Sequence, residues 1–211
     1  MTIDIQKNVN PHFKPVWVSK LPYNVLAGGR NSFKSSVVAL NMVYGMAKFL
    51  KKNKKANAVV IRKVGNTIRD SVYLKIQWAL NLFGLSGRFK ATVSPFKIQD
   101  RVTGSCFYFY GQDDFQKLKS NDIGNIISVW YEEAAEFANQ EDFDQTNVTF
   151  MRQKHPDVPF VKFFWWYNPP RNPYSWINEW WDSLKEREDY LLHKSSYLDD
   201  ELGFVTDQML A

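Results

Sequence analysis

The stretch VLAGGRNSFKSSVV, at positions 25–38, contains the pattern of a phosphate-binding loop except at one position. The P-loop pattern requires glycine, any four residues, a second glycine, lysine, and then serine or threonine. Gly28, Lys34 and Ser35 have the required spacing, whereas Phe33 occupies the place of the second glycine. An incomplete match of this kind also arises by chance, so the flanking sequence has to decide.

The flanks supply the structural context that the motif needs. The apolar run NVLAG (24–28) predicts a buried strand, and KSSVVALNMVYGMAKFL (34–50) has the apolar spacing of an amphipathic helix. Between them, backbone N–H groups from Gly28 to Lys34 would cradle phosphates at the start of a helix. Lys34 would then reach the β- and γ-phosphates, and Ser35 would ligate magnesium.

The composition is that of one globular domain. The chain has 211 residues, 45% of them hydrophobic, which is enough for a substantial core. No apolar run approaches the ~20 residues of a membrane span, and the N-terminus lacks a signal pattern, so we predict a cytosolic protein. The single Cys106 excludes an internal disulfide, and three scattered histidines do not indicate a zinc site.

The net charge of +5 is concentrated in the lysine-rich segment 51–55. This segment fits a solvated loop after a helix, and it also fits a contact with a nucleic-acid backbone. Charge alone does not decide between them.

The rest of the chain alternates between strand and helix patterns. Further strands are predicted at 56–63, 125–137 and 158–170, a helix at 66–84, and short β segments around a hairpin at 103–104. This alternation predicts an α/β fold with a mostly parallel central sheet flanked by helices. In such folds ligands bind at the carboxyl ends of the strands.

Two acids follow one of these strands directly. An apolar run, 126–131, ends in Glu132 and Glu133. In a P-loop hydrolase the first acid would bind the magnesium shell, and the second would orient or deprotonate the attacking water. Alternatively, Glu132, Glu133 and Glu136 would only enrich the first turn of a helix, where the helix dipole favours acids.

Several motifs in order resemble the ATPase domain of a tailed-phage terminase large subunit. The motifs are GGRNSFKSS, VIRKVGNTIRDSVY, FYGQDDFQKLKS, VWYEEAAEF and WWYNPP, and the resemblance extends from about Val16 to Asp199. It implies a P-loop NTPase fold of the RecA/ASCE type and a single N-terminal ATPase domain over residues 1–211. It also implies that ATP, with Mg²⁺, powers translocation of double-stranded viral DNA into a procapsid.

The resemblance further implies partners and residue roles. The partners are viral DNA, the portal protein, the small terminase subunit and further copies in a ring on the procapsid, in the cytoplasm of the infected bacterial host. Glu133, Arg30 and Lys34 would be catalytic, and Ser35 and Glu132 would hold the metal. Asn168 would couple hydrolysis to movement, although Asn168-Pro169-Pro170 also fits a strand-ending turn. The nucleotide would contact Gly28, Gly29, Arg30, Asn31, Ser32, Phe33, Lys34, Ser35 and Ser36, and the candidates for a basic group acting on a neighbouring subunit are Lys119, Lys117 and Arg101.

The sequence also departs from the family pattern. Family loops usually have glycine at the positions of Asn31 and Phe33, and Phe33 needs both space and allowed torsions beside the phosphates. Family members normally continue into a C-terminal nuclease domain, and this 211-residue sequence does not include one. We therefore expect no nuclease activity from this chain. Alternative functions are a helicase or recombinase-like ATPase, and a nucleotide-binding module with impaired hydrolysis.

Other residues have two interpretations each. Tyr23 is a candidate for stacking on adenine, and Arg62 would face the nucleotide or extend to solvent. The tryptophans at 165, 166, 176, 180 and 181 fit a hydrophobic core better than a platform for stacking bases.

Overall fold

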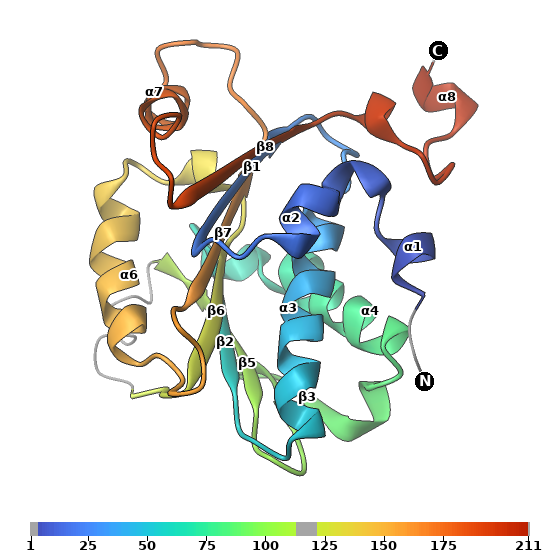
Figure 1. The fold of residues 1–211 in the computed structure, drawn as a ribbon, viewed down its shortest axis with the longest axis vertical. Coiled ribbons are helices and arrows are strands. Elements are labelled where there is room, and N and C mark those ends of the chain that lie inside the picture. Colours follow the sequence, from blue (N-terminus) through green and yellow to red (C-terminus); the bar gives the residue numbers. More distant parts are fainter. Residues whose placement is uncertain (1–3, 113–121, 211) are drawn as a thin grey trace.

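The computed structural model describes residues 4–112 and 122–210, and it has one central sheet with helices on both faces (Figure 1). The strands are β1 Tyr23–Gly28, β2 Asn57–Arg62, β3 Phe89–Val93, β4 Phe96–Asp100, β5 Cys106–Gly111, β6 Ile126–Tyr131, β7 Lys162–Tyr167 and β8 Tyr190–Ser195. Their order across the sheet is β3-β4-β5-β2-β6-β7-β1-β8. Only the pairs β3–β4 and β4–β5 are antiparallel among the described strands, so the mostly parallel α/β fold is confirmed.

The helices form a layer on each side of the sheet, with α3 and α4 on one face and α6 and α7 on the other (Figure 1). Their bounds are α1 Ile5–Asn8, α2 Lys14–Val18, α3 Lys34–Lys51, α4 Leu74–Leu82, α6 Glu141–Arg152, α7 Trp176–Ser183 and α8 Asp207–Leu210. None of the helices within the described ranges is both long and apolar enough to cross a membrane.

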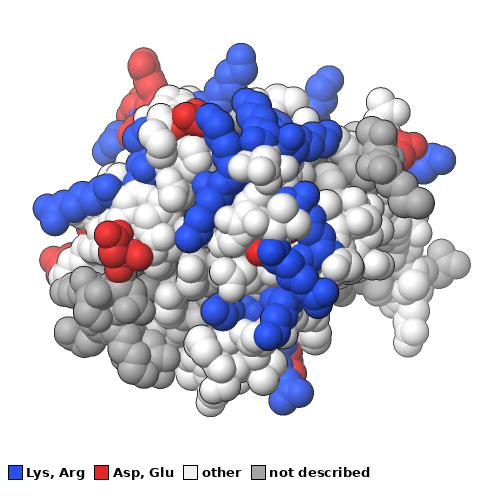
Figure 2. Space-filling model, turned by 90° about the horizontal axis from the view of Figure 1, so that it is seen from below, with Lys and Arg blue, Asp and Glu red and all other residues white. Residues whose placement is uncertain are grey.

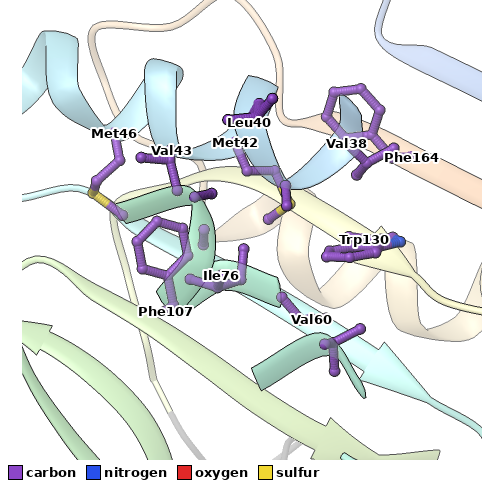
Figure 3. Close-up of a cluster of buried hydrophobic side chains, with 14 of the residues drawn as sticks. Val38, Leu40, Met42, Val43, Met46, Val60, Ile76, Phe107, Trp130 and Phe164 are labelled. Atoms are coloured by element: carbon purple, nitrogen blue, oxygen red, sulfur yellow. The ribbon is translucent and has the colours of Figure 1, made fainter. Parts of the chain in front are cut away.

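The α3 face of the sheet carries the larger hydrophobic cluster. Figure 3 shows Val38 and Met42 of α3 close to Trp130 of β6 and Phe164 of β7. These side chains are almost completely buried, and each contributes roughly 1.5–3 kcal/mol through the apolar area it removes from water. The cluster attaches the helix that follows the phosphate-binding loop firmly to the sheet.

The opposite face is dominated by aromatic residues. Trp165 of β7 stacks on Tyr131 of β6, with ring centroids 5.5 Å apart, and meets Trp180 of α7 edge to face. Trp181 is also buried, and Trp176 packs against the same cluster. The prediction that the tryptophans belong to the core is therefore confirmed.

The strand order brings three chain segments to one edge of the sheet. Strand β7 lies between β1 and β6, with Ala27 paired to Tyr167 and Tyr131 paired to Trp165. Because all three strands are parallel, the residues that follow them meet at the same edge. This arrangement places the loop after β1 next to Asn168 and to the acids after β6.

The predicted helix over 66–84 is only partly correct. The chain forms a 3₁₀ turn at Gly65–Thr67 and a π-helical turn at Arg69–Tyr73 before α4 begins. Side chains compete for the backbone here, because the Thr67 carbonyl accepts hydrogen bonds from Arg62 (3.2 Å) and from the hydroxyl of Ser71 (2.9 Å). Amphipathic periodicity in the sequence does not predict these side chain–backbone hydrogen bonds, so it missed the irregular turns.

Candidate nucleotide-binding site

A cavity of about 540 Å³ opens at the carboxyl edge of the parallel strands. Residues 29–36, all predicted to bind nucleotide, line it, together with Glu133 and Asn168. The remaining lining residues are Lys75, Trp166, Phe204, Val205 and Met209. The structure thus brings the predicted loop, the second acid and the predicted coupling residue around one space.

Gly28 is the last residue of β1, before the loop turns toward α3, and the neighbouring strand leaves no room for a side chain there. It pairs with Ser195 of β8, and a Cβ atom at Gly28 would lie 2.1 Å from the Ser195 carbonyl oxygen. Backbone at that distance cannot move aside without separating the two strands. The first glycine of the motif is therefore required by the sheet itself.

Asn31 and Phe33, which stand where family loops have glycine, adopt a backbone conformation that glycine favours. Asn31 has a φ of 59° and Phe33 a φ of 62°, both in the left-handed region. This conformation costs a non-glycine residue about 1–2 kcal/mol. The ring of Phe33 packs against the α3-face cluster and lies 5.8 Å from the ring of Phe204, so packing offsets the strain.

Lys34 is the first residue of α3, and its amino group is held inside the loop. The Nζ atom donates hydrogen bonds to the carbonyl oxygens of Gly28 (2.8 Å) and Gly29 (2.7 Å) and to the hydroxyl of Ser32 (2.8 Å). It also lies 3.3 Å from the amide oxygen of Asn168. Burial lowers the pKa of Lys34 to about 8, because the charged form loses solvation. An anionic ligand in the cavity would stabilise the charged form of Lys34 and raise its pKa again.

The two acids after β6 differ in exposure. Glu132 is 6% exposed, while Glu133 lines the cavity and turns away from the strand with a φ of 51°. Burial raises the pKa of Glu132 to about 7, and the nearby charge of Arg62 and a hydrogen bond from Ser71 oppose this rise. Hydrogen bonding with Glu133 raises the pKa of Glu136 to about 7.

Arg62, the last residue of β2, connects both acids. Its Nε lies 3.0 Å from Oε2 of Glu132, and its Nη2 donates to Oε2 of Glu133 at 3.0 Å. The guanidinium is buried, so neither of the two expected placements, at the nucleotide or extended to solvent, describes it. Arg62 is a structural partner of the acid pair.

Two of the side chains that line the cavity, Ser35 and Glu133, carry oxygen atoms of the kind that binds magnesium. Ser35 is the second residue of α3, and Glu133 follows β6 by two residues. Glu132 is buried beside Arg62 and does not line the cavity. In the described residues no group of three or more His, Cys, Asp or Glu side chains is placed to hold a metal by itself. Mg²⁺ usually binds through one or two protein oxygens together with phosphates and water.

Some sequence candidates lie elsewhere. Arg30 is exposed and lines the cavity, whereas Arg101 is on the turn between β4 and β5, at the opposite edge of the sheet. Lys117 and Lys119 lie outside the described residues. Tyr23 begins β1, at the end far from the loop, and stacks on Tyr190, so the cavity is not lined by the residue proposed to contact adenine.

The mostly parallel sheet, the glycine loop with its buried lysine and the paired acids two strands away define a P-loop NTPase fold. The family model for the phage terminase large subunit matches residues 20–210. The chain therefore belongs to the phage terminase large subunit family.

Individual relatives agree with this assignment. The terminase large subunit of Bacillus phage SPP1 is 30% identical over 203 residues, which cover 93% of this chain and 47% of that protein. The PBSX phage terminase large subunit of Bacillus subtilis (strain 168) is 34% identical over 155 residues, or 73% of this chain and 33% of that protein. The chain thus spans half or less of the length of these curated relatives.

Solved structures show the same fold at low sequence identity. The large terminase of a thermophilic bacteriophage superposes with a TM-score of 0.71 at 16% identity, covering 95% of this chain and 48% of that one. The N-terminal domain of the DNA packaging ATPase from bacteriophage phi29 has a TM-score of 0.61 at 16% identity, with coverage of 94% and 99%.

Proposed function

We propose that this chain binds and hydrolyses ATP with magnesium, and that hydrolysis drives double-stranded viral DNA into a procapsid. The observation that carries the proposal is the position of Lys34, whose amino group is buried in the loop beside Asn168 and a cavity that Glu133 lines. The large terminase of the thermophilic bacteriophage, which has the same fold, was solved in complex with ATP-gamma-S and with ADP.

The residues divide the chemistry among them. Lys34 would exchange its carbonyl acceptors for phosphate oxygens, and the loop N–H groups would bind the remaining phosphate charge. Glu133, which lines the cavity, would orient or deprotonate the attacking water. Ser35 and Glu132 would hold magnesium, which neutralises charge on the phosphates. Arg30 would contact the γ-phosphate from the exposed side of the loop.

The opposite edge of the sheet offers a surface for DNA. We call it the basic surface and define it by the exposed residues Lys51, Lys52, Lys54, Lys55 and Arg101. Lys55 lies beside Gly104, in the turn that carries Arg101, so the two loops adjoin. Figure 2, which views the molecule from below, shows Lys and Arg side chains gathered on this side with few acids among them. Such a surface suits the phosphate backbone, which is read by charge and not by sequence.

Membership of the family supports a proposal for the assembly. The portal protein, the small terminase subunit and further copies in a ring on the procapsid would be its partners, in the cytoplasm of the infected host. Lys117, Lys119 or Arg101 would supply the basic group that acts on a neighbouring subunit.

Phosphate release by the purified chain, with and without magnesium, tests the enzyme activity. Lys34→Ala should abolish measurable turnover, since no other described group combines a buried amine with the loop carbonyls. Lys48→Ala is the matched control, because Lys48 belongs to the same helix but is exposed and lies over the ring of Tyr44. Turnover by Lys34→Ala at the wild-type rate would contradict the assignment.

A further inference from the structure

Lys75, the second residue of α4, reaches the nucleotide cavity from a different helix than Lys34. It lines the same space as Lys34 and Glu133, and its Nζ lies 3.4 Å from the hydroxyl of Ser36, to which it donates. The side chain is partly buried. No motif contains this lysine, and on an amphipathic helix it is indistinguishable from a solvated residue.

The irregular turn before α4 is held next to the acids of the site, and Lys75, the second residue of α4, follows it. The hydroxyl of Ser71, in the π-helical turn, lies 3.0 Å from Oε2 of Glu132. Lys75 follows four residues later, and the charge of Glu132 acts on it. The turn is also attached to the sheet through Arg62, which donates to the hydroxyl of Ser71 at 3.0 Å. π-helical turns of this kind occur frequently at functional sites.

The charge of Lys75 lacks a close partner. Glu132 and Glu133 are paired with Arg62, and among the described residues no acid forms an ion pair with Lys75. Burial lowers the pKa of Lys75, and the more distant charge of Glu132 opposes that change. The amino group also lies 5.1 Å from the centre of the Trp78 ring. A partly desolvated cation of this kind, aimed into a cavity, is stabilised when an anion occupies the cavity.

We propose that Lys75 binds the terminal phosphate of the bound nucleoside triphosphate, within the same subunit. The inference rests on the proposed function, since it assigns a further contact in the same site. The terminal phosphate is the group that a triphosphate has and a diphosphate lacks. Lys75 therefore contributes to the preference for ATP over ADP, and it adds a cation in cis to any basic group that a neighbouring subunit supplies.

Calorimetry with ATP-gamma-S and with ADP, in the presence of magnesium, tests this role. Lys75→Gln should weaken the binding of ATP-gamma-S by about 10- to 100-fold, the range for losing a hydrogen bond to a charged group. The affinity for ADP should change by less than about twofold, because the lost contact is absent from the ADP complex. Lys75→Arg keeps the charge and should recover most of the difference. Lys48→Gln, which also removes a helical lysine that lies over an aromatic ring, should change neither affinity.

The ratio of the two affinities separates the possible results. An equal loss for both nucleotides in Lys75→Gln, or no loss for either, would overturn the role of Lys75. If Lys34→Ala loses binding while Lys75→Gln keeps the wild-type ratio, the inference is wrong and the proposed function stands. If the wild-type chain binds neither nucleotide, both are wrong. A thermal melt of each variant shows whether it is folded, and Lys75→Arg provides the second test if Lys75→Gln is not.

Discussion

The amino group of Lys34 lies 3.3 Å from the amide oxygen of Asn168, although the two residues are 134 positions apart in the chain. The contact joins the phosphate-binding loop to the residue that follows β7. A displacement of the Lys34 amino group toward a phosphate would therefore remove a hydrogen-bond donor from Asn168. This contact is a physical basis for the proposed coupling role of Asn168.

Two substitutions at Asn168 should therefore have different effects. Asn168→Asp places a carboxylate next to the Lys34 amine, where it competes with the phosphates. We expect it to weaken ATP binding by roughly tenfold or more, on the order of one charge-assisted hydrogen bond. Asn168→Ala should leave binding within a few-fold and reduce the DNA packaged per ATP hydrolysed. Nucleotide titrations and a packaging assay measure the two effects, and equal affinities for both variants would contradict this mechanism.

The acids after β6 should separate into a binding role and a catalytic role. Glu133→Gln should reduce the rate by ~10²–10⁴, the usual loss when a general base is removed, and leave ATP affinity largely unchanged. Glu132→Gln should weaken magnesium-dependent binding as well as turnover. Calorimetry and steady-state phosphate release on both variants make the comparison. Normal hydrolysis by Glu133→Gln but not by Glu132→Gln would assign the base to the other carboxylate.

His193 on β8 should make stability depend on pH. Burial, followed by the nearby charge of His12, lowers the pKa of His193 to about 4. The histidine charges more easily in the unfolded chain, so its contribution is complete above pH ~6.5 and is lost as the pH falls toward 4.

Comparison with His193→Leu, which does not titrate, isolates this effect. The wild type should lose roughly 1–3 kcal/mol relative to the variant between pH 7 and pH 4, a range that allows for solvent screening. Denaturant unfolding across this pH range measures the difference between the two proteins, and a constant difference would show that His193 does not titrate in this range.

The basic surface should determine the salt dependence of DNA binding. Replacing Lys51 and Lys52 with glutamine should reduce the slope of log K against log salt by up to about 2, as each lost phosphate contact removes close to 0.9. The control is the double variant Arg171→Gln with Lys185→Gln, which removes the same amount of charge at exposed positions outside the basic surface. Its slope should stay at the wild-type value. Equal slopes for the two double variants would place the DNA elsewhere.

The sequence determined the parts of the site that depend on short-range order. Loop and helix are contiguous, so the spacing from Gly28 to Lys34 and Ser35, taken together with the apolar patterns on both flanks, predicts them. The structure confirms the strand and helix on either side. The alternation of strands and helices also predicted a ligand site at the carboxyl ends of parallel strands, which is where the loop, the acids and Asn168 each follow a strand. That prediction follows from chain direction alone, and the strand order confirms it.

Only the tertiary structure decided which side chains reach the cavity from elsewhere. Arg62 bridges the two acids, and Glu133 but not Glu132 lines the cavity, because β2 lies beside β6 and the chain turns with a left-handed residue at Glu133. Lys75 and Phe204 reach it through a π-helical turn and a C-terminal segment that periodicity does not describe. Periodicity in a sequence separates buried from exposed faces. It does not tell a polar side chain in solvent from one in a cavity, since that depends on contacts between distant segments.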